Sequence, residues 1–327
     1  MADRITDLLA RQAYDLAAMQ DGDAARVLRL AIDARRELRE RLDALVTSGE
    51  ASRTRYTAQH LRVMLAQTEQ VVITLRQRLD ATLQEGKQAA ARGALRDTLH
   101  TIRAHQEEFR DTGNRIELDA IRRMSADQGL LLHRYSIDRY GAAVVEKVQQ
   151  ELSVALFQGQ TLRQVAQRIT SVDGAFQAQT WRAQLIARME ISKAYNDGHQ
   201  ASLEAASEVL DDPGTDDPLL RQANEFLDTR NHPISRVIDG MVSGIRTPWL
   251  VSVAEVRAEG DRIKKSPSGV LWPEVGGQYV CGGYPLHFGE RGRSVPYRAS
   301  WDDGAALKGI TSKQAAQLPE ALRQKIA

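Results

Sequence analysis

This sequence of 327 residues contains few prolines, one cysteine and few aromatic residues, and its net charge is close to zero. Each of these features excludes certain structures or functions. The single cysteine, Cys281, rules out a disulfide bond within the chain and is typical of a reducing compartment. Basic and acidic residues nearly balance, at 44 and 43. The formal net charge of +1 therefore gives no general reason to expect binding to nucleic acid or to a membrane surface.

Long apolar runs are missing as well. The strongest, such as Val71-Val72-Ile73, are much shorter than the roughly 20 residues that a membrane-spanning helix needs. The first residues, Met1-Ala2-Asp3-Arg4, open an amphipathic segment without the apolar core of a signal peptide. We therefore expect a soluble protein without membrane contact, which is either intracellular or assembled inside a cell.

Proline and aromatic residues are distributed unevenly along the chain. All nine prolines lie at or after Pro213, and aromatic residues make up only 5% of the whole. Because proline breaks the interior of a helix, the preceding stretch, rich in Ala, Leu, Arg and Gln, is predicted to be mostly helical. The last third follows a different pattern, so the predicted fold class is mainly α with a C-terminal α+β region.

Heptad-like spacing runs through the first 114 residues. It joins Leu28, Ala31, Arg35, Leu38, Leu42 and Leu45, then Leu61, Leu65, Thr68, Val72, Leu75 and Leu79, and finally, after Glu85-Gly86, Leu95, Leu99, Ile102 and Phe109. Thr47 and Glu50 have capping-box spacing between the first two stripes. Residues 1–114 are therefore predicted to form an elongated helical hairpin or bundle, which either packs on itself or is an arm that docks on a partner.

Two further segments are predicted. Residues 115–212 should be helical and more globular, and should end in a long helix over about residues 177–208. Residues 213–327 should form a compact α+β part that ends in a helix over about residues 312–326. The short strand candidates are Trp249-Leu250-Val251, Val270-Leu271-Trp272 and Gln278-Tyr279-Val280, and Asp239-Gly240 predicts a hairpin between Arg236-Val237-Ile238 and Met241-Val242.

The long helix carries polar residues where burial is expected. Apolar residues surround it, so the side chain of Asn196 must find hydrogen-bond partners in the interior. A polar loop lies about 40 residues further on, and its Arg230 could form a bidentate pair with Glu190. We interpret the two stretches as a structural tether made by Arg188, Glu190, Asn196, Asp228, Arg230, His232, Asp239 and Gly240.

Two alternatives would give these residues a chemical role. Glu190 and His232 could serve a metal-dependent hydrolase. His232, Cys281 and His287 form the only plausible set of zinc ligands, but a fourth ligand is missing and no CxxC or HxxxH spacing exists.

A third alternative is a nucleic-acid contact. The densest basic patch contains His287, Arg291, Arg293 and Arg298, interleaved with aromatic residues. Such a patch could contact DNA phosphates or an acidic protein surface, and its arginines could equally pair within the protein.

Several motifs together resemble one family. In chain order they are Leu156-Phe157-Gln158-Gly159-Gln160-Thr161, Ile186-Ala187-Arg188-Met189-Glu190-Ile191, Asn196-Asp197-Gly198, Asp228-Thr229-Arg230 with His232, and Ile238-Asp239-Gly240. Their order and spacing over roughly residues 140 to 300 resemble the phage head morphogenesis family, which includes the Mu F-like minor head proteins.

The resemblance implies a minor structural protein of a tailed-phage head rather than an enzyme. It implies a place in the virion after assembly in the host cytoplasm, with the portal protein or the major capsid protein as partner and a possible contact with packaged DNA. Many members carry paired cysteines near the polar loop, where this chain has Asn231 and His232. We therefore expect no cofactor and no metal.

Overall fold

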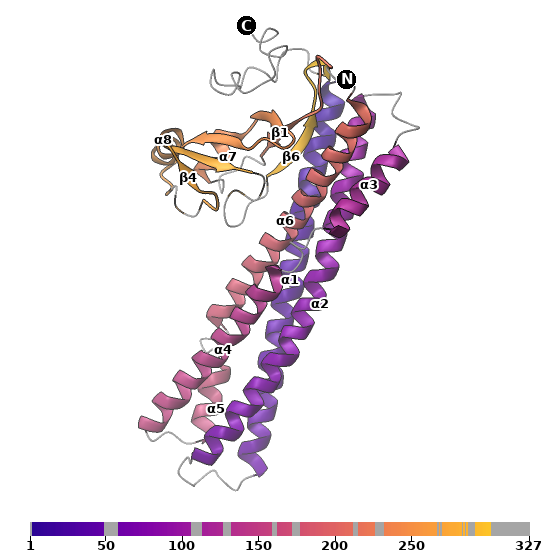
Figure 1. The fold of residues 1–327 in the computed structure, drawn as a ribbon. Coiled ribbons are helices and arrows are strands. Elements are labelled where there is room, and N and C mark those ends of the chain that lie inside the picture. Colours follow the sequence, from indigo (N-terminus) through magenta and orange to yellow (C-terminus); the bar gives the residue numbers. More distant parts are fainter. Residues whose placement is uncertain are drawn as a thin grey trace. The chain divides into compact units, whose positions relative to one another are not determined.

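The computed structural model describes residues 2–48, 58–105, 113–126, 132–158, 162–171, 177–211, 215–225, 232–266, 268, 270–282, 284, 286 and 292–301. Long helices occupy the chain as far as Leu210, and small antiparallel sheets follow (Figure 1), which confirms the predicted fold class. The long helices are α1 (Ala2–Ser48), α2 (Ala58–His105), α3 (Gly113–Ala126), α4 (Leu132–Phe157), α5 (Leu162–Thr170) and α6 (Gln177–Leu210). Across these ranges, none of the helices combines the length and the apolar character needed to cross a bilayer.

The chain divides into two compact units. The helical unit comprises residues 20–86 and 129–190, and the mixed unit comprises residues 1–19, 87–128 and 191–327. Three helices, α1, α2 and α6, continue from one unit into the other. The division therefore passes through helices, and it does not coincide with the segment boundaries at 114 and 212 expected from the sequence.

Apolar stripes at helical spacing form the core of the helical unit. Leu38 and Leu42 of α1 lie in one buried cluster with Leu75 and Leu79 of α2 and Val144 of α4. Four of these five residues belong to the heptad stripes, so the periodicity located this core correctly. An ion pair between Arg168 of α5 and Glu151 of α4 lies at its border, with 2.5 Å between Nε and Oε2.

The two positions between the predicted stripes have different outcomes. Glu85-Gly86 does not interrupt α2, because a helix-interior glycine costs only about 1 kcal/mol and the buried stripe continues beyond it. Thr47 lies in the last turn of α1 and its hydroxyl donates to the carbonyl of Asp43 over 2.8 Å. Glu50, the other half of the predicted capping box, lies outside the described residues.

The strands of the mixed unit form two small antiparallel sheets, ordered β2-β1-β6 and β3-β5-β4. Gly276 and Gly277, with φ of 58° and 78°, make the two-residue turn between β4 and β5. Two strand predictions are confirmed by β3 and β5, whereas Val270 makes only an isolated bridge, and the predicted helix at 312–326 lies outside the described residues. The elements are β1 (Leu220–Asn224), α7 (Pro233–Ile238), β2 (Val242–Gly244), β3 (Trp249–Ser252), α8 (Val253–Ile263), β4 (Glu274–Val275), β5 (Gln278–Cys281), β6 (Arg293–Tyr297) and the 3-10 helix η3 (Ala299–Trp301).

The hairpin predicted at Asp239-Gly240 is wrong. A short helix, α7, occupies the place of its first strand, because the His232 side chain caps the helix and Pro233 fits its first turn. Gly240 does form a turn, with φ of 79°, but this turn leads from α7 into β2. Strand β2 then pairs with β1 rather than with the preceding residues.

Candidate functional site

Polar side chains concentrate in the interior of the mixed unit. They come from α1, α2, α6 and β6, and we call this group the polar seam. Its members are Gln12, Asp97, Thr98, Thr101, Tyr195, Asn196, His199, Arg293 and Ser294, and all of them are buried. Groups of this kind must satisfy one another, because an unpaired polar atom in the interior costs about 1–3 kcal/mol.

A carboxylate, a phenol and a guanidinium form the centre of the polar seam. The Tyr195 hydroxyl donates to the Asp97 carboxylate, and Nη1 of Arg293 donates to the Tyr195 oxygen over 3.4 Å. Gln12 donates from Nε2 to the Asp97 carbonyl over 3.1 Å. Burial raises the pKa of Asp97, and the Tyr195 hydrogen bond and the Arg293 charge oppose that rise. Tyr195 thus bridges a buried acid and a buried base from different elements.

His199 lies beside this centre as a neutral imidazole. Its Nδ1 is 2.5 Å from the hydroxyl oxygen of Thr98, and the Thr98 hydroxyl itself donates to the carbonyl of Ala94 over 2.9 Å. Because the Thr98 proton is used in this way, Nδ1 must carry the ring proton and donate it. Burial and the charge of Arg293 hold the pKa of His199 well below its usual 6.5.

Asn196 hydrogen-bonds the start of β6. Its Oδ1 accepts from the N–H of Ser294, and its Nδ2 donates to the carbonyl of Gly292, each over 3.4 Å. The same Nδ2 donates to the carbonyl of Ser192 within α6 over 2.9 Å. The sequence indicated that Asn196 needs buried partners, and two of its three partners, Gly292 and Ser294, lie at the start of β6.

Asn196→Leu is expected to lower the free energy of unfolding by about 1–3 kcal/mol, because it removes partners of Gly292 and Ser294. Limited proteolysis should then cleave first around residues 292–298 rather than around residues 226–231. Gln150→Leu, the same kind of change at an exposed position of α4, is the matched control. A melting temperature and a cleavage pattern like those of the wild type would refute this role of Asn196.

The other residues of the predicted tether are only partly brought together. Arg188 and Glu190 belong to the helical unit, where Arg188 forms an ion pair with Asp21 at 3.0 Å. In the mixed unit, Asp239 accepts the backbone N–H of Glu225 through Oδ1 over 2.9 Å. Asp228 and Arg230 lie outside the described residues, so the predicted pair of Arg230 with Glu190 stays a prediction.

His232 has a structural role. Its Nδ1 accepts the N–H of Ile234 over 3.2 Å, which caps α7, and its Nε2 lies 2.9 Å from the Ser268 carbonyl. Since Nδ1 accepts, Nε2 carries the proton and donates to Ser268. Both ring nitrogens are thus engaged, which leaves neither ready to bind a metal or to accept a proton from a substrate.

Cys281, the second candidate metal ligand, is buried at the end of β5, and burial raises its pKa to about 12. A thiol in this state is neither a good nucleophile nor a ready metal ligand. His287 lies outside the described residues. Within the ranges that the structure describes, no three His, Cys, Asp or Glu side chains are placed to hold a metal ion.

Two arginines of the predicted basic patch are buried. Arg293 is 0% exposed and lies in the polar seam, whereas Arg298 is 8% exposed and pairs with Asp211 at 2.5 Å. Their charges are therefore used inside the mixed unit, which argues against a contact of these two with DNA phosphates. His287 and Arg291 lie outside the described residues.

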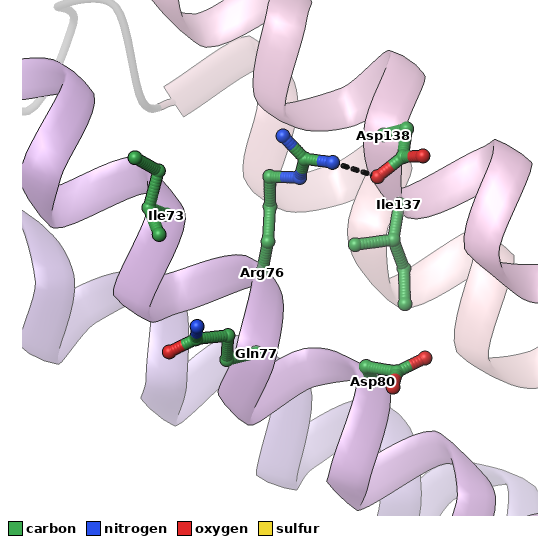
Figure 2. A pocket seen from close by; sticks show the side chains of 6 residues that line it. All are labelled: Ile73, Arg76, Gln77, Asp80, Ile137 and Asp138. Atoms are coloured by element: carbon green, nitrogen blue, oxygen red, sulfur yellow. Dashed lines mark hydrogen bonds and ion pairs between the residues drawn. The ribbon is translucent and has the colours of Figure 1, made fainter.

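A groove of about 300 Å³ lies between α2 and α4 in the helical unit (Figure 2). Its lining consists of Ile73, Arg76, Gln77, Asp80, Ile137 and Asp138. Figure 2 shows Arg76 extending from α2 towards Asp138 of α4, with which it forms an ion pair. Both side chains are well exposed, so this pair contributes at most about 1 kcal/mol. Because Arg76 is committed to Asp138, we assign no ligand to the groove.

Arg221 of β1 is a further buried cation, which sequence reasoning missed. Its guanidinium lies 4.0 Å from the centre of the Trp249 ring and donates to the carbonyls of Thr247 and Gly282 over 2.7 and 2.8 Å. Burial lowers the pKa of Arg221 to about 10, so it stays charged at neutral pH. The group connects β1 to the residues that precede β3 and follow β5, which lie at the same end of the second sheet.

Asp97 and His199 were missed as well, although a signal for Asp97 exists. The segment from Ala89 to Ala94 is almost entirely small residues, which is typical of a helix packed closely on several sides. Asp97 lies three residues after Ala94, on the same side of the helix as this closely packed segment, so it is expected to be buried and paired.

These features describe a helix-rich protein with a small α+β region whose prominent polar residues mostly bind one another. In comparisons with known proteins, no family model, no curated protein and no solved structure matches the chain. The function has to be inferred from its own residues and their packing.

Proposed function

We propose that this chain is a minor structural protein of a tailed-phage head, which acts at the portal vertex in capsid assembly or in genome packaging or delivery. The proposal starts from the ordered set of motifs between residues 140 and 300 that resembles the head morphogenesis family. It includes the portal protein or the major capsid protein as partner, and a place in the finished virion.

The observation that supports a structural role most strongly is how the motif residues are used. Asn196 holds the start of β6, His232 caps α7, and Asp239 fixes the backbone of Glu225. Among them, His232 is the side chain that both the hydrolase and the zinc alternatives would need. Their engagement in the packing of the mixed unit favours a protein that works through its shape and its surfaces.

The proposal predicts that the protein is present in purified virions and copurifies with the portal protein. The test is to tag the gene in its phage, band the particles in a density gradient, and identify the chain by mass spectrometry and immunoblot. Deletion of the gene should yield defective heads, and the wild-type chain should restore them.

An Arg246→Ala chain serves as the control for complementation, because Arg246 is well exposed and its loss should leave the fold intact. Detection in the cell lysate only, together with normal particles after deletion, would contradict the proposal. Retention on DNA that disappears with moderate salt would instead favour the DNA-binding alternative.

A further inference from the structure

The polar seam holds β6 against α6 through charged and titratable groups rather than through apolar side chains alone. Arg293 and Ser294 of β6 bond to Tyr195 and Asn196 of α6, and Tyr195 in turn bonds to Asp97 of α2. An attachment of this kind depends on the protonation state of its members, because a charge gained in the interior has to be compensated there.

His199 is the member whose protonation has the least compensation. Its Nδ1–H already donates to Thr98, and Nε2 is a buried acceptor for which the described residues offer no hydrogen-bond partner. A proton added to Nε2 would create a second buried cation near Arg293, with no acceptor for the new N–H.

The surroundings of the ring offer it little counter-charge. From α6 itself the ring meets the edge of Tyr195, with ring centres 4.8 Å apart, and from α2 it meets the neutral hydroxyl of Thr98. From β6 the charge that acts on it is Arg293. Asp97 of α2 is the nearest described acid of the polar seam, and it already accepts the Tyr195 hydroxyl.

The remaining charged groups act on Asp97 or lie further along α6. Asp15 of α1 and Arg96 of α2 influence the Asp97 carboxyl. Glu204, more than one turn of α6 beyond the ring, is paired with Arg123 of α3. The described elements around His199 therefore present it with a cation, a phenol and a hydroxyl.

We propose that His199 makes the attachment of β6 to α6 and α2 an acid-sensitive latch, which is closed at neutral pH and opens when the imidazole takes up a proton. The latch is a property of the mixed unit and does not depend on the function proposed above. It would let a fall in pH release the strand β6 that completes the sheet β2-β1-β6.

Whether acid opens or closes the latch follows from which state binds more protons. A histidine in the open or unfolded state titrates near 6.5, and the closed state holds the pKa of His199 well below that value. The open state therefore binds more protons below pH 6.5, so stability is fully present above 6.5 and is lost as the pH falls towards the lower pKa. The proton difference is about one half at pH 6.5 and approaches one at lower pH, where opening becomes about tenfold more favourable per pH unit.

Asp97 acts in the opposite direction. Its pKa is raised above the ordinary 3.8 by burial, so protonation of Asp97 favours the closed state. The two groups can be separated experimentally, because His199→Asn removes the contribution of the histidine and leaves that of Asp97 in place.

The test is hydrogen–deuterium exchange of the full-length protein at pH 7.5, 6.5 and 5.5, corrected for the intrinsic exchange rate. Peptides that cover residues 293–297 should lose protection about fivefold between pH 6.5 and 5.5, and about tenfold between pH 7.5 and 5.5. His199→Asn, which keeps a side-chain N–H donor for Thr98 but does not titrate, should abolish this loss. His100→Asn, a change at an exposed histidine of α2, is the matched control and should behave like the wild type.

Three outcomes would overturn the proposal. One is unchanged protection of residues 293–297 in the wild type down to pH 5.5, and another is an equal loss in His199→Asn. The third is an equal loss in peptides from α4, which would show that the acid response is not local to the latch.

A second measurement covers the case in which His199→Asn does not fold. Long-range 1H–15N spectra of wild-type protein with labelled histidines report the protonation of each ring. The signal of a neutral ring protonated at Nδ1 should persist until protection of β6 is lost. A ring that protonates reversibly while β6 stays protected would equally overturn the proposal.

Discussion

Gly198→Ala is expected to destabilise the protein by about 1–3 kcal/mol, although alanine is the better helix former. Gly198 lies where α6 crosses α2 within the mixed unit. A Cβ atom there would lie 2.8 Å from the carbonyl oxygen and 3.0 Å from the Cα of Ala91. Because these are backbone atoms of a helix, they cannot move aside as a flexible side chain would. The two helices would have to separate, which would disturb the nearby polar seam.

Gly22→Ala is the matched control for this experiment. Gly22 is exposed in α1, and a Cβ atom there would meet nothing within 4 Å. This substitution should therefore stabilise the protein by about 0.5–1 kcal/mol through helix preference alone. Urea denaturation followed by circular dichroism measures both variants. The free energy of unfolding should fall for Gly198→Ala and rise for Gly22→Ala. A rise for both variants would refute close packing at Gly198.

Arg221→Ala should have the largest effect of the substitutions considered, a loss of about 3–5 kcal/mol. The change removes the cation from the face of Trp249 and takes the donor away from the Gly282 carbonyl. It also leaves a cavity in place of a side chain that is only 2% exposed. Arg221→Lys should recover only part of the loss, because one ammonium group cannot reproduce the planar set of donors.

Arg246→Ala provides the contrast. Arg246 pairs with Glu204 and Glu208 at 3.6 and 3.2 Å, but its side chain is 67% exposed. Its removal should change the free energy of unfolding by no more than about 1 kcal/mol. Tryptophan fluorescence in urea should distinguish the two arginine variants clearly. Similar losses for both would mean that the interactions of Arg221 are worth no more than a surface ion pair.

Helices were predictable because their signal is local. Leu38, Leu42, Leu75 and Leu79 repeat at helical spacing, and all four are buried in the helical unit. The absence of proline before Pro213 excluded frequent breaks in the helices over the same stretch. The spacing of apolar residues and the lack of proline can both be read from the sequence alone, and the packing of the helices agrees with them.

The predicted hairpin failed because two local signals competed. Asp239-Gly240 is a strong turn signal, and the turn exists. His232-Pro233 is a helix-start signal seven residues earlier, and it decides the conformation of the residues between them. The partner of β2 was then set by tertiary pairing with β1, which no short-range pattern encodes.

The members of the polar seam were only partly predictable for a related reason. Burial of Asn196 follows from the apolar residues around it, but its partners in β6 lie 96 and 98 positions further along the chain. The small residues before Asp97 indicate its burial but not its partners, and His199 has no comparable signal. His199 lies next to Tyr195 because they are four residues apart on α6, whereas only the fold brings Asp97 and Arg293 next to Tyr195.

The side-chain amide of Asn196 has the shape of a peptide group, and it occupies the outer edge of β6 as a neighbouring strand would. The N–H of Ser294 and the carbonyl of Gly292 are already taken there. A strand from another copy of the chain would have to displace Asn196 before it could extend the sheet at this position. One residue of a helix thereby helps to stop the sheet from growing into an aggregate.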